Sequence, residues 1–235
     1  MSESLPISTN QLANVSLEEK TLLEKHLRLV LQANVQINLT RISSFQEGLL
    51  LHIEDSLAGL PEFSKAPDGL YADLGTGAGY PGIPLAIVSC RKTLLVDSVR
   101  KKAAVLDSII EEIGIQGQVC TYAGRVEQLA RVRKEEFAVL TARALASLSS
   151  LIELAAPLLC LSGQLICYKA QLCEEELSSA RSLEEKIGMR LVSDREFFLC
   201  DKQTTRRILV FEKYAQPSIS LPRREGMAQK RPYLP

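Results

Sequence analysis

The feature that most constrains this chain is an apolar run, Leu70–Ala72, that leads directly into the segment Asp73-Leu-Gly-Thr-Gly-Ala-Gly-Tyr-Pro-Gly. An apolar run followed by closely spaced glycines predicts a buried strand that breaks into a tight loop. Glycines permit positive φ and let a ligand approach the backbone where a Cβ would collide. The pattern therefore predicts a cofactor loop at a strand end, and a plain turn without a ligand is the alternative.

Two classes of cofactor fit such a loop. Gly77, Gly79 and Gly82 match the G-x-G-x-x-G fingerprint of dinucleotide-binding proteins. Asp97 also lies near the spacing at which that fingerprint places an acid on a ribose hydroxyl. Adenosine in either cofactor offers such a ribose, so Asp97 does not separate an NAD enzyme from a methyltransferase.

The residues around the loop favour S-adenosylmethionine over a dinucleotide. Asp73 places a carboxylate at the strand end, which suits a cationic sulfonium and would repel a pyrophosphate. A pyrophosphate binds free amides at a helix N-terminus, and Pro81 and Pro84 remove two of them. We therefore expect S-adenosylmethionine, with an NAD-dependent oxidoreductase as the alternative.

Strand-like and helix-like segments alternate from residue 70 onwards. We expect strands at 70–74, 93–97, 117–122, 137–142 and 164–169, helices at 83–90, 99–113, 125–131, 144–161 and 173–187, and final extended segments at 190–199 and 207–212. Repeated strand–helix alternation implies a parallel sheet with helices on both faces. The two final strands, joined by a short polar turn, predict an antiparallel edge hairpin. The expected fold is therefore α/β, a Rossmann-like class I S-adenosylmethionine-dependent methyltransferase sheet.

The first part of the chain has helical patterns. Capping boxes at Ser16-Leu-Glu-Glu and Ser44-Phe-Gln-Glu predict two helices, with Pro61 ending the second and residues 61–69 forming a linker. We expect an N-terminal helical extension at 1–69, a methyltransferase domain at 70–213 and a basic C-terminal tail at 214–235.

The charges are unevenly distributed although the formal net charge is zero. Residues 1–70 hold nine acids and five bases, whereas residues 195–235 hold nine bases and four acids. A basic end on a neutral protein is a candidate phosphate-binding face, and a solvated end is the alternative. Because the tail is remote in sequence from the strand-end residues, we expect it to leave cofactor binding unaffected.

Other sequence features bear on location and metals. The chain has no run of about 18 uncharged apolar residues and begins without a secretory signal pattern. Its six cysteines form no C-x-x-C pair and accompany only two histidines. We therefore expect a cytoplasmic protein with reduced thiols, no membrane association and no metal site.

Ligands of open α/β sheets bind at the carboxyl ends of the strands. Asp97 ends the second strand, where it could bind ribose hydroxyls or, with Ser98, cap the next helix. Glu127 follows the third strand, where it could accept an adenine amino group or lie in solvent. Arg143 ends the fourth and could bind a donor carboxylate, a substrate phosphate or a structural acid. Lys169, beside Tyr168, ends the fifth on the expected substrate side, or forms an ordinary strand end.

Several segments together resemble one family. They are Asp73-Leu-Gly-Thr-Gly-Ala-Gly-Tyr-Pro-Gly-Ile-Pro, Leu95-Val-Asp-Ser, Arg125-Val-Glu, Thr141-Ala-Arg-Ala-Leu-Ala-Ser-Leu, Tyr168-Lys-Ala, Asn38-Leu-Thr, His52-Ile-Glu-Asp-Ser-Leu and Pro222-Arg-Arg-Glu-Gly-Met-Ala-Gln-Lys-Arg-Pro. This set resembles the RsmG (GidB-type) family of bacterial 16S ribosomal RNA guanine-N7 methyltransferases over nearly the whole chain. One mild departure is Val99-Arg-Lys-Lys, where family members often have a different residue before the basic pair.

The resemblance, taken with the loop residues, implies a set of donor and RNA contacts. The expected cofactor-binding residues are Asp73, Gly75, Gly77, Tyr80, Asp97, Ser98, Val99, Val126, Glu127 and Arg143. The expected RNA-binding residues are Lys169, Arg223, Arg224, Lys230 and Arg231. The implied partner is 16S ribosomal RNA or the small ribosomal subunit, bound by a monomer.

The implied reaction does not require the protein to supply a strong base. Guanine N7 carries an in-plane lone pair and no proton, so its attack on a sulfonium methyl requires alignment rather than a strong base. No catalytic group is assigned, and Arg143 and Lys169 are the candidates. A non-enzymatic RNA-binding protein with a vestigial pocket is a further alternative.

Overall fold

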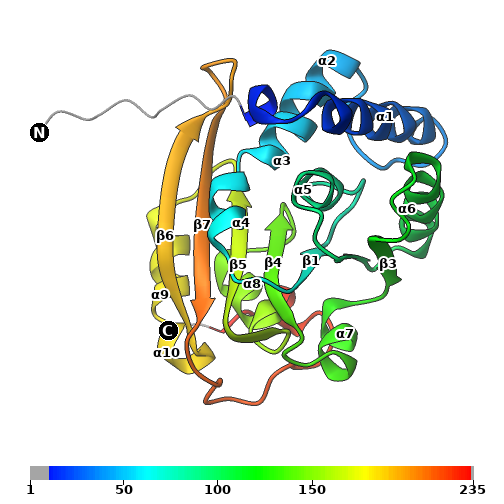
Figure 1. Cartoon of the computed structure of the whole chain (residues 1–235). Coiled ribbons are helices and arrows are strands. Elements are labelled where there is room, and N and C mark those ends of the chain that lie inside the picture. Colours follow the sequence, from blue (N-terminus) through cyan, green and yellow to red (C-terminus); the bar gives the residue numbers. More distant parts are fainter. Residues whose placement is uncertain (1–10, 234–235) are drawn as a thin grey trace, which may run out of the picture.

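The computed structural model describes residues 11–233, and their centre is a seven-stranded mixed sheet (Figure 1). The strands are β1 (Leu70–Leu74), β2 (Thr93–Asp97), β3 (Val119–Ala123), β4 (Phe137–Arg143), β5 (Leu159–Lys169), β6 (Met189–Phe198) and β7 (Thr205–Lys213). Their order is β3-β2-β1-β4-β5-β7-β6. Strands β1 to β5 are parallel, whereas β7 pairs antiparallel with β5 and β6. This arrangement confirms the predicted parallel sheet and its antiparallel edge hairpin.

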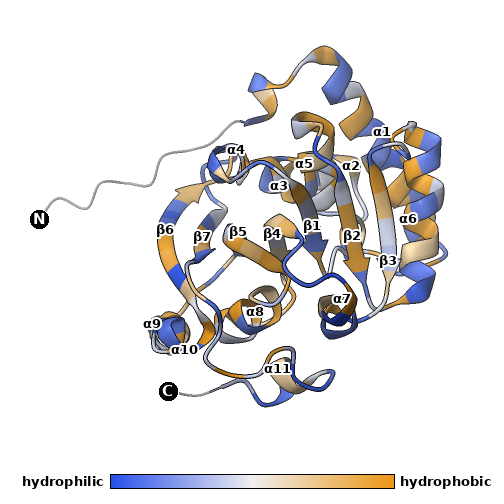
Figure 2. Ribbon diagram, turned by 60° about the horizontal axis from the view of Figure 1, so that its bottom comes forward, coloured by the Kyte–Doolittle hydropathy of each residue, from blue (hydrophilic) through white to orange (hydrophobic). Residues whose placement is uncertain are grey.

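Helices cover both faces of the sheet. They are the 3₁₀ turn η1 (Gln11–Asn14), α1 (Leu17–Asn34), α2 (Phe45–Gly48), the π-helical η2 (Leu49–Glu54), α3 (Asp55–Leu57), α4 (Leu60–Lys65), α5 (Gly82–Ser89), α6 (Arg100–Ile113), α7 (Val126–Val132), α8 (Leu148–Ala155), α9 (Glu174–Arg181), α10 (Glu184–Ile187) and α11 (Met227–Lys230). Apolar residues of α1, α5 and α6 form a core on one face. Residues of α7, α8, α9 and α11 form another core on the opposite face, and Figure 2 shows the sheet between these layers.

Three predicted boundaries are wrong. Helix α8 is shorter than the expected 144–161, because Pro157 lacks an amide donor and the chain enters β5 at Leu159. The expected helix at 173–187 is divided into α9 and α10. The expected linker at 61–69 contains helix α4, with Pro61 in its first turn and Phe63 buried against Tyr71, 4.7 Å between ring centroids.

The two ends of the described chain pack on the central sheet unit. Ser16 and Glu19 form the predicted capping box of α1, which packs against α5 and α6. At the other end α11 packs on α8, where the Ser150 hydroxyl donates to the Ala228 carbonyl over 2.7 Å. The domain boundaries at 69 and 213 stay predictions. The first ten residues, for which no secretory signal is expected, and residues 234–235 lie outside the described range.

The longest helix of residues 11–233 is α1, and none of the described helices combines the length and apolarity needed to cross a bilayer.

Candidate active site

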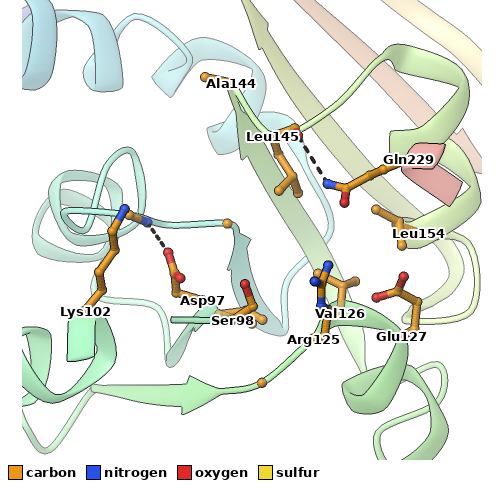
Figure 3. Close-up of a pocket in the computed structure, with 14 residues that line it drawn as sticks. Asp97, Ser98, Lys102, Arg125, Val126, Glu127, Ala144, Leu145, Leu154 and Gln229 are labelled. Atoms are coloured by element: carbon orange, nitrogen blue, oxygen red, sulfur yellow. Dashed lines mark hydrogen bonds between the residues drawn. The ribbon is translucent and has the colours of Figure 1, made fainter. Parts of the chain in front are cut away.

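A pocket, here pocket A, opens at the carboxyl ends of β1, β2 and β3 (Figure 3). It is lined by Gly75, Gly77, Val96, Asp97, Ser98, Lys102, Gly124, Arg125, Val126, Glu127, Ala144, Leu145, Leu154 and Gln229. Six of the ten residues expected to bind the donor lie in this set, namely Gly75, Gly77, Asp97, Ser98, Val126 and Glu127. The sheet therefore brings together predicted residues from three separate strand ends.

Asp97 connects the glycine loop to the start of α6. Its Oδ2 accepts from the Gly77 amide over 3.0 Å, and its Oδ1 accepts from the Val99 amide over 2.8 Å. Figure 3 shows the carboxylate pointing from β2 toward the loop. A carboxylate oxygen can accept more than one hydrogen bond, so both oxygens keep capacity for a ligand hydroxyl. The N-cap residue of α6 is Val99 and no side chain caps this helix, so the alternative that Asp97 or Ser98 is the N-cap is wrong. Contact of Asp97 with a ribose stays a prediction.

The Asp73 carboxylate holds the end of the glycine loop in place through hydrogen bonds. This carboxylate is fully buried and accepts hydrogen bonds from the Thr141 hydroxyl over 2.7 Å and the Gly82 amide over 3.0 Å. Burial raises the pKa of Asp73 to about 6, against the lowering effect of these bonds. Asp73 does not line pocket A, so its expected attraction for a cationic donor would act through the buried loop.

Glycine is required at Gly77 and at Gly75 for two different structural reasons. Gly77 has a φ of +59°, and a Cβ built there would meet no atom closer than 4.0 Å, so its backbone conformation is the constraint. Gly75 also has positive φ, and its Cβ would lie 2.7 Å from the Leu145 Cδ1 atom. The loop backbone consequently forms one open wall of pocket A.

Pocket A has the composition that an adenosyl group requires. The Gly77 backbone leaves room for close approach, Asp97 offers carboxylate oxygens, and Val126 and Leu154 supply apolar walls. Glu127 adds a carboxylate that is 5% exposed. An apolar cleft with a few convergent polar groups is typical of cofactor sites, so the residues present fit S-adenosylmethionine.

The C-terminal tail contributes to pocket A, contrary to the expectation from sequence. Glu127 Oε1 accepts from the Gly226 amide over 2.6 Å. Gln229 lines the pocket and its Nε2 donates to the Leu145 carbonyl over 3.3 Å (Figure 3). After β7 the chain runs back and places α11 beside pocket A. The tail is therefore remote from the strand-end residues in sequence but close to them in space.

A second pocket, here pocket B, adjoins pocket A through Ala144, which lines both. It is lined by Ile42, Leu51, His52, Asp55, Arg143, Ala144, Tyr168, Lys169, Ala170, Gln171 and Arg206. These residues come from the N-terminal helical segment, from the ends of β4 and β5 and the residues just after them, and from the start of β7. Pocket B therefore lies on the side of β4 and β5, where the sequence places the substrate.

Buried charges form the back of pocket B. Arg143 Nη1 donates to Asp55 Oδ2 and to the Leu51 carbonyl, both over 3.1 Å. The other oxygen of Asp55 accepts from Arg206 Nε over 2.9 Å. The Asp55 side chain is 6% exposed and each arginine side chain 17%. One carboxylate thus holds two guanidinium groups in place.

A stack of rings lies beside Arg143. The His52 and Tyr80 rings are parallel with centroids 4.3 Å apart, and His26 lies 4.6 Å from Tyr80 on centroids. Burial lowers the pKa of both histidines to about 3, so both are neutral at pH 7. Since a guanidinium can only donate, His52 Nδ1 accepts from Arg143 Nη2 over 3.4 Å. The Arg143 Cζ atom lies 5.6 Å from the centroid of the Tyr80 ring. Tyr80, Val99 and Arg143 do not line pocket A, and their donor contacts stay predictions.

The predicted residues of the fifth strand are engaged by protein groups. Lys169 Nζ donates to Glu176 Oε1 over 2.6 Å and to the Ala146 carbonyl over 3.0 Å. The Tyr168 hydroxyl donates to the Ser56 carbonyl over 2.8 Å, and that ring is buried. Both residues line pocket B, where the charge of Lys169 is paired with that of Glu176.

The four basic residues predicted in the tail differ in environment. Arg223 forms a bidentate pair with Glu153, over 2.7 and 2.5 Å, and Glu153 is 3% exposed. This pairing raises the pKa of Arg223. Arg224, Lys230 and Arg231 are exposed and make no ion pair with another residue of the described range. Arg223 therefore stabilises the tail, while the other three stay available as predicted RNA contacts.

Many residues that line the two pockets were missing from the predicted set, and five with polar or charged side chains are considered first. They are His52, Asp55, Lys102, Arg206 and Gln229. His52 and Asp55 belong to a segment that carried the family resemblance, but nothing in the sequence indicated their role. The remaining three reach the pockets only through the packing of α6, β7 and α11.

The sheet order, the glycine loop and pocket A define the class I, Rossmann-like methyltransferase fold. Geranyl diphosphate C-methyltransferase from Streptomyces coelicolor, solved with S-adenosyl-L-homocysteine, matches with a TM-score of 0.51 at 10% identity over 67% of this chain and 77% of that one. The [4+2]-cyclase SpnF matches with a TM-score of 0.55 at 13% identity, over 68% and 81% of the two chains. Because these structures of similar fold include a cyclase, the fold alone does not define the reaction.

Comparison of sequences defines the family. The family model described as rRNA small subunit methyltransferase G matches residues 19–205. Ribosomal RNA small subunit methyltransferase G from Carboxydothermus hydrogenoformans is 34% identical over 222 residues, which cover 93% of this chain and 94% of that protein. The protein of the same name from Trichormus variabilis is 34% identical over 212 residues, covering 87% and 86%. This chain belongs to the rRNA small subunit methyltransferase G family.

Proposed function

We propose that this protein transfers a methyl group from S-adenosylmethionine, bound in pocket A, to N7 of one guanine in 16S ribosomal RNA. The observation that carries the proposal is the junction at Ala144, which lines both pocket A and the charged pocket B. A donor and an acceptor can therefore meet on one side of the sheet. Membership in the rRNA small subunit methyltransferase G family supports RNA as the substrate class.

The loop contacts disfavour the dinucleotide alternative. A pyrophosphate would need free amides from the glycine loop. The Gly77 amide donates to Asp97 and the Gly82 amide donates to Asp73, so two of the three fingerprint glycines have their amides occupied by carboxylates. The same carboxylates favour a donor that carries positive charge.

Positioning is the main contribution expected from the protein. S-adenosylmethionine would supply an electrophilic methyl group on a sulfonium. Guanine N7 has no proton to lose, and the histidines of the site are neutral and held by Ala78 and Thr40 contacts. Holding two reactants in line can supply much of the rate acceleration without a base. Arg143 is the charged group nearest the junction in sequence and is the first candidate for orienting the acceptor.

The remaining elements of the proposal concern the setting of the reaction. We propose a cytoplasmic monomer that binds 16S ribosomal RNA, free or within the small subunit, without a metal ion. The exposed bases Arg224, Lys230 and Arg231 and the pocket-B residue Lys169 are the proposed phosphate contacts.

The test uses the full chain, tritiated S-adenosylmethionine and two substrates from a strain lacking this methylation. Naked 16S RNA and intact small subunits are incubated in parallel, and the label is mapped to a nucleotide and to an atom of the base. We expect label on N7 of one guanine in at least one substrate, with matched RNA already methylated at that position as the control. Absence of label from both, or label on another base or atom, would contradict the proposal.

A further inference from the structure

We infer that residues 221–231, here the C-terminal strap, form a lid of pocket A whose closure is stabilised by the methyl donor, and that the closed strap presents three exposed bases to RNA phosphates. The inference rests on the proposed function and adds that the donor raises the affinity of the protein for RNA. The strap is then the element through which pocket A and the RNA-binding surface influence each other.

The strap is attached to the rest of the protein by side chains. No backbone-to-backbone hydrogen bond joins residues 221–231 to another part of the described chain. Instead, Gln128 Nε2 donates to Glu225 Oε1 over 3.0 Å, and the Glu153 carboxylate pairs with Arg223. The helix inside the strap, α11, has four residues and packs next to α8 (Figure 2). A segment held in this way opens locally at a lower free energy than a sheet whose strands share backbone hydrogen bonds.

The inner face of the strap belongs to pocket A. Gln229 lines this pocket, and the Gly226 amide donates to Glu127, which also lines it. Figure 3 shows Gln229 and Glu127 on the same side of the pocket. Ala228, between them in the strap, is 1% exposed, and its carbonyl accepts from the Ser150 hydroxyl on α8. Opening of the strap therefore removes one wall of pocket A and the amide that holds Glu127.

Glu127 connects the strap to a ligand in pocket A. Its side chain is buried, so its carboxylate requires hydrogen-bond donors, and Gly226 supplies one. A carboxylate can accept several hydrogen bonds, so Glu127 can accept from the strap and from an adenine amino group at the same time. A ligand that binds more tightly when the strap is closed stabilises the closed strap by the same free energy.

The outer face of the strap is basic. Arg224 lies two positions before Gly226, and Lys230 and Arg231 directly follow Gln229. The side chains of these three bases are exposed. A short segment thus forms a wall of pocket A with some of its residues and offers free positive charges to phosphates with others. Charges on an ordered segment lose less conformational entropy on binding than charges on a mobile one, so the closed strap binds RNA more tightly.

The first experiment measures opening of the strap by trypsin in the full, unmodified chain. Cleavage requires local opening, so its rate reports the population of the open form. The sites compared by mass spectrometry are Arg224 and Lys230 in the strap and the exposed Lys202 between β6 and β7, which lines neither pocket. S-adenosylhomocysteine is the probe. At about 100 times its dissociation constant, we expect cleavage in the strap to slow by about tenfold or more and cleavage at Lys202 to change by less than about twofold.

The second experiment measures the linkage to RNA. Filter binding of 16S RNA is compared with and without S-adenosylhomocysteine at several salt concentrations. We expect the added ligand to tighten RNA binding by about fivefold or more. The slope of log affinity against log salt should also steepen by up to about two units, since each additional phosphate contact contributes about 0.7–0.9.

Two variants locate the linkage. Replacing Arg224, Lys230 and Arg231 together by Ala should abolish both effects on RNA binding, while the affinity for S-adenosylhomocysteine without RNA changes by less than about twofold. The matched control replaces three exposed bases that line neither pocket, and it should keep the linkage. These bases are Lys134, Arg181 and Lys202.

The outcomes separate the inference from the proposed function. Absence of S-adenosylhomocysteine binding in calorimetry would overturn both. Binding that leaves cleavage in the strap unchanged, or that slows cleavage at Lys202 equally, would overturn the inference and leave the function standing. An increase in RNA affinity that persists in the strap variant would also overturn the inference, because another part of the protein would then carry the linkage.

Discussion

Pocket A and pocket B both lie at the carboxyl ends of the parallel strands, but their polar groups are held in different ways. Two carboxylates of pocket A accept from backbone amides, Asp97 from Gly77 and Glu127 from Gly226. In pocket B the Asp55 carboxylate instead accepts from two side chains, Arg143 and Arg206. A pocket made from backbone can be encoded within a short stretch of chain. A pocket made from paired side chains requires residues from distant segments, and its stability depends on all of them.

Because of this difference, we expect substitutions in the two pockets to have different effects. Removing one partner of a buried ion pair leaves an uncompensated charge, whereas removing one carboxylate that caps an amide leaves a neutral group. Substitutions in pocket B should therefore affect folding stability more, and substitutions in pocket A should affect donor affinity more.

The largest effect is expected for Asp55→Ala. The change leaves Arg143 and Arg206 without their shared carboxylate, so the free energy of unfolding should fall by about 3–5 kcal/mol. Urea denaturation measures this value. Glu212→Gln, which removes a partly exposed pair with Arg190, should cost less than about 1 kcal/mol. Equal losses of unfolding free energy for the two variants would contradict the proposed difference between the pockets.

A pH-dependent effect is expected for His26, which lies fully buried and binds the Ala78 carbonyl next to the glycine loop. Burial lowers its pKa from 6.5 to about 3. Between these values the unfolded chain binds a proton that the folded protein does not, so this contribution to stability is present above pH 6.5 and is lost as pH falls.

His26→Gln should reduce the pH slope of the unfolding free energy by about 1.4 kcal/mol per unit between pH 4 and 6. Asp73, whose pKa is raised to about 6, contributes a slope of opposite sign in the same window. It is present in both proteins, so the difference between the two slopes isolates His26. Identical slopes from urea titrations at several pH values would show that His26 is not held neutral.

Asp97→Ala tests pocket A directly. The change removes the acceptor of the Gly77 and Val99 amides and the expected ribose contact, so donor affinity should fall by about 1–3 kcal/mol. Isothermal titration calorimetry with S-adenosylmethionine measures it. Asp107→Ala is the matched control and should bind normally, because Asp107 is an exposed α6 acid that accepts from Thr121. Unchanged affinity for Asp97→Ala would mean that this residue only holds the Gly77 and Val99 amides.

Substitutions in the C-terminal tail test whether RNA binding is separate from both pockets. Replacing Arg224, Lys230 and Arg231 by Ala should lower the slope of log affinity against log salt by about two units, since each phosphate contact contributes about 0.7–0.9. Arg223 is kept because it holds Glu153. Filter binding of 16S RNA at several salt concentrations measures the slope. An unchanged slope would direct the search to the exposed bases at the start of α6.

The smallest effect is expected for Gln229→Ala, which tests the contact of the tail with pocket A. Loss of the Gln229 side chain opens the wall beside Leu145, and donor affinity should fall by about 0.5–1.5 kcal/mol. Calorimetry measures it, with Lys230→Ala as the neighbouring control. A normal affinity would mean that the tail packs beside pocket A without contributing to binding.

Local pattern predicted most of the sheet and much of pocket A. The strands at 70–74 and 93–97 have the expected ends, because Gly75 follows the first apolar run and Asp97 ends the second. The start of β5 was missed, since the apolar run after Pro157 fits either period. The role of Asp55 was also missed, because an acid in a helix looks the same whether it meets solvent or two arginines.

The sequence by itself determined the glycine loop, the strand ends that carry Gly75, Gly77 and Asp97, and the family. These features depend on backbone conformation and on strands that run parallel, which neighbouring residues largely decide. Only the tertiary structure decided that Asp55 and Arg206 meet at Arg143, that Arg223 holds Glu153, and that Gln229 returns to pocket A. The reason is that an ion pair or a pocket wall depends on separation in space, and packing brings together residues that are 70 or more positions apart in the sequence.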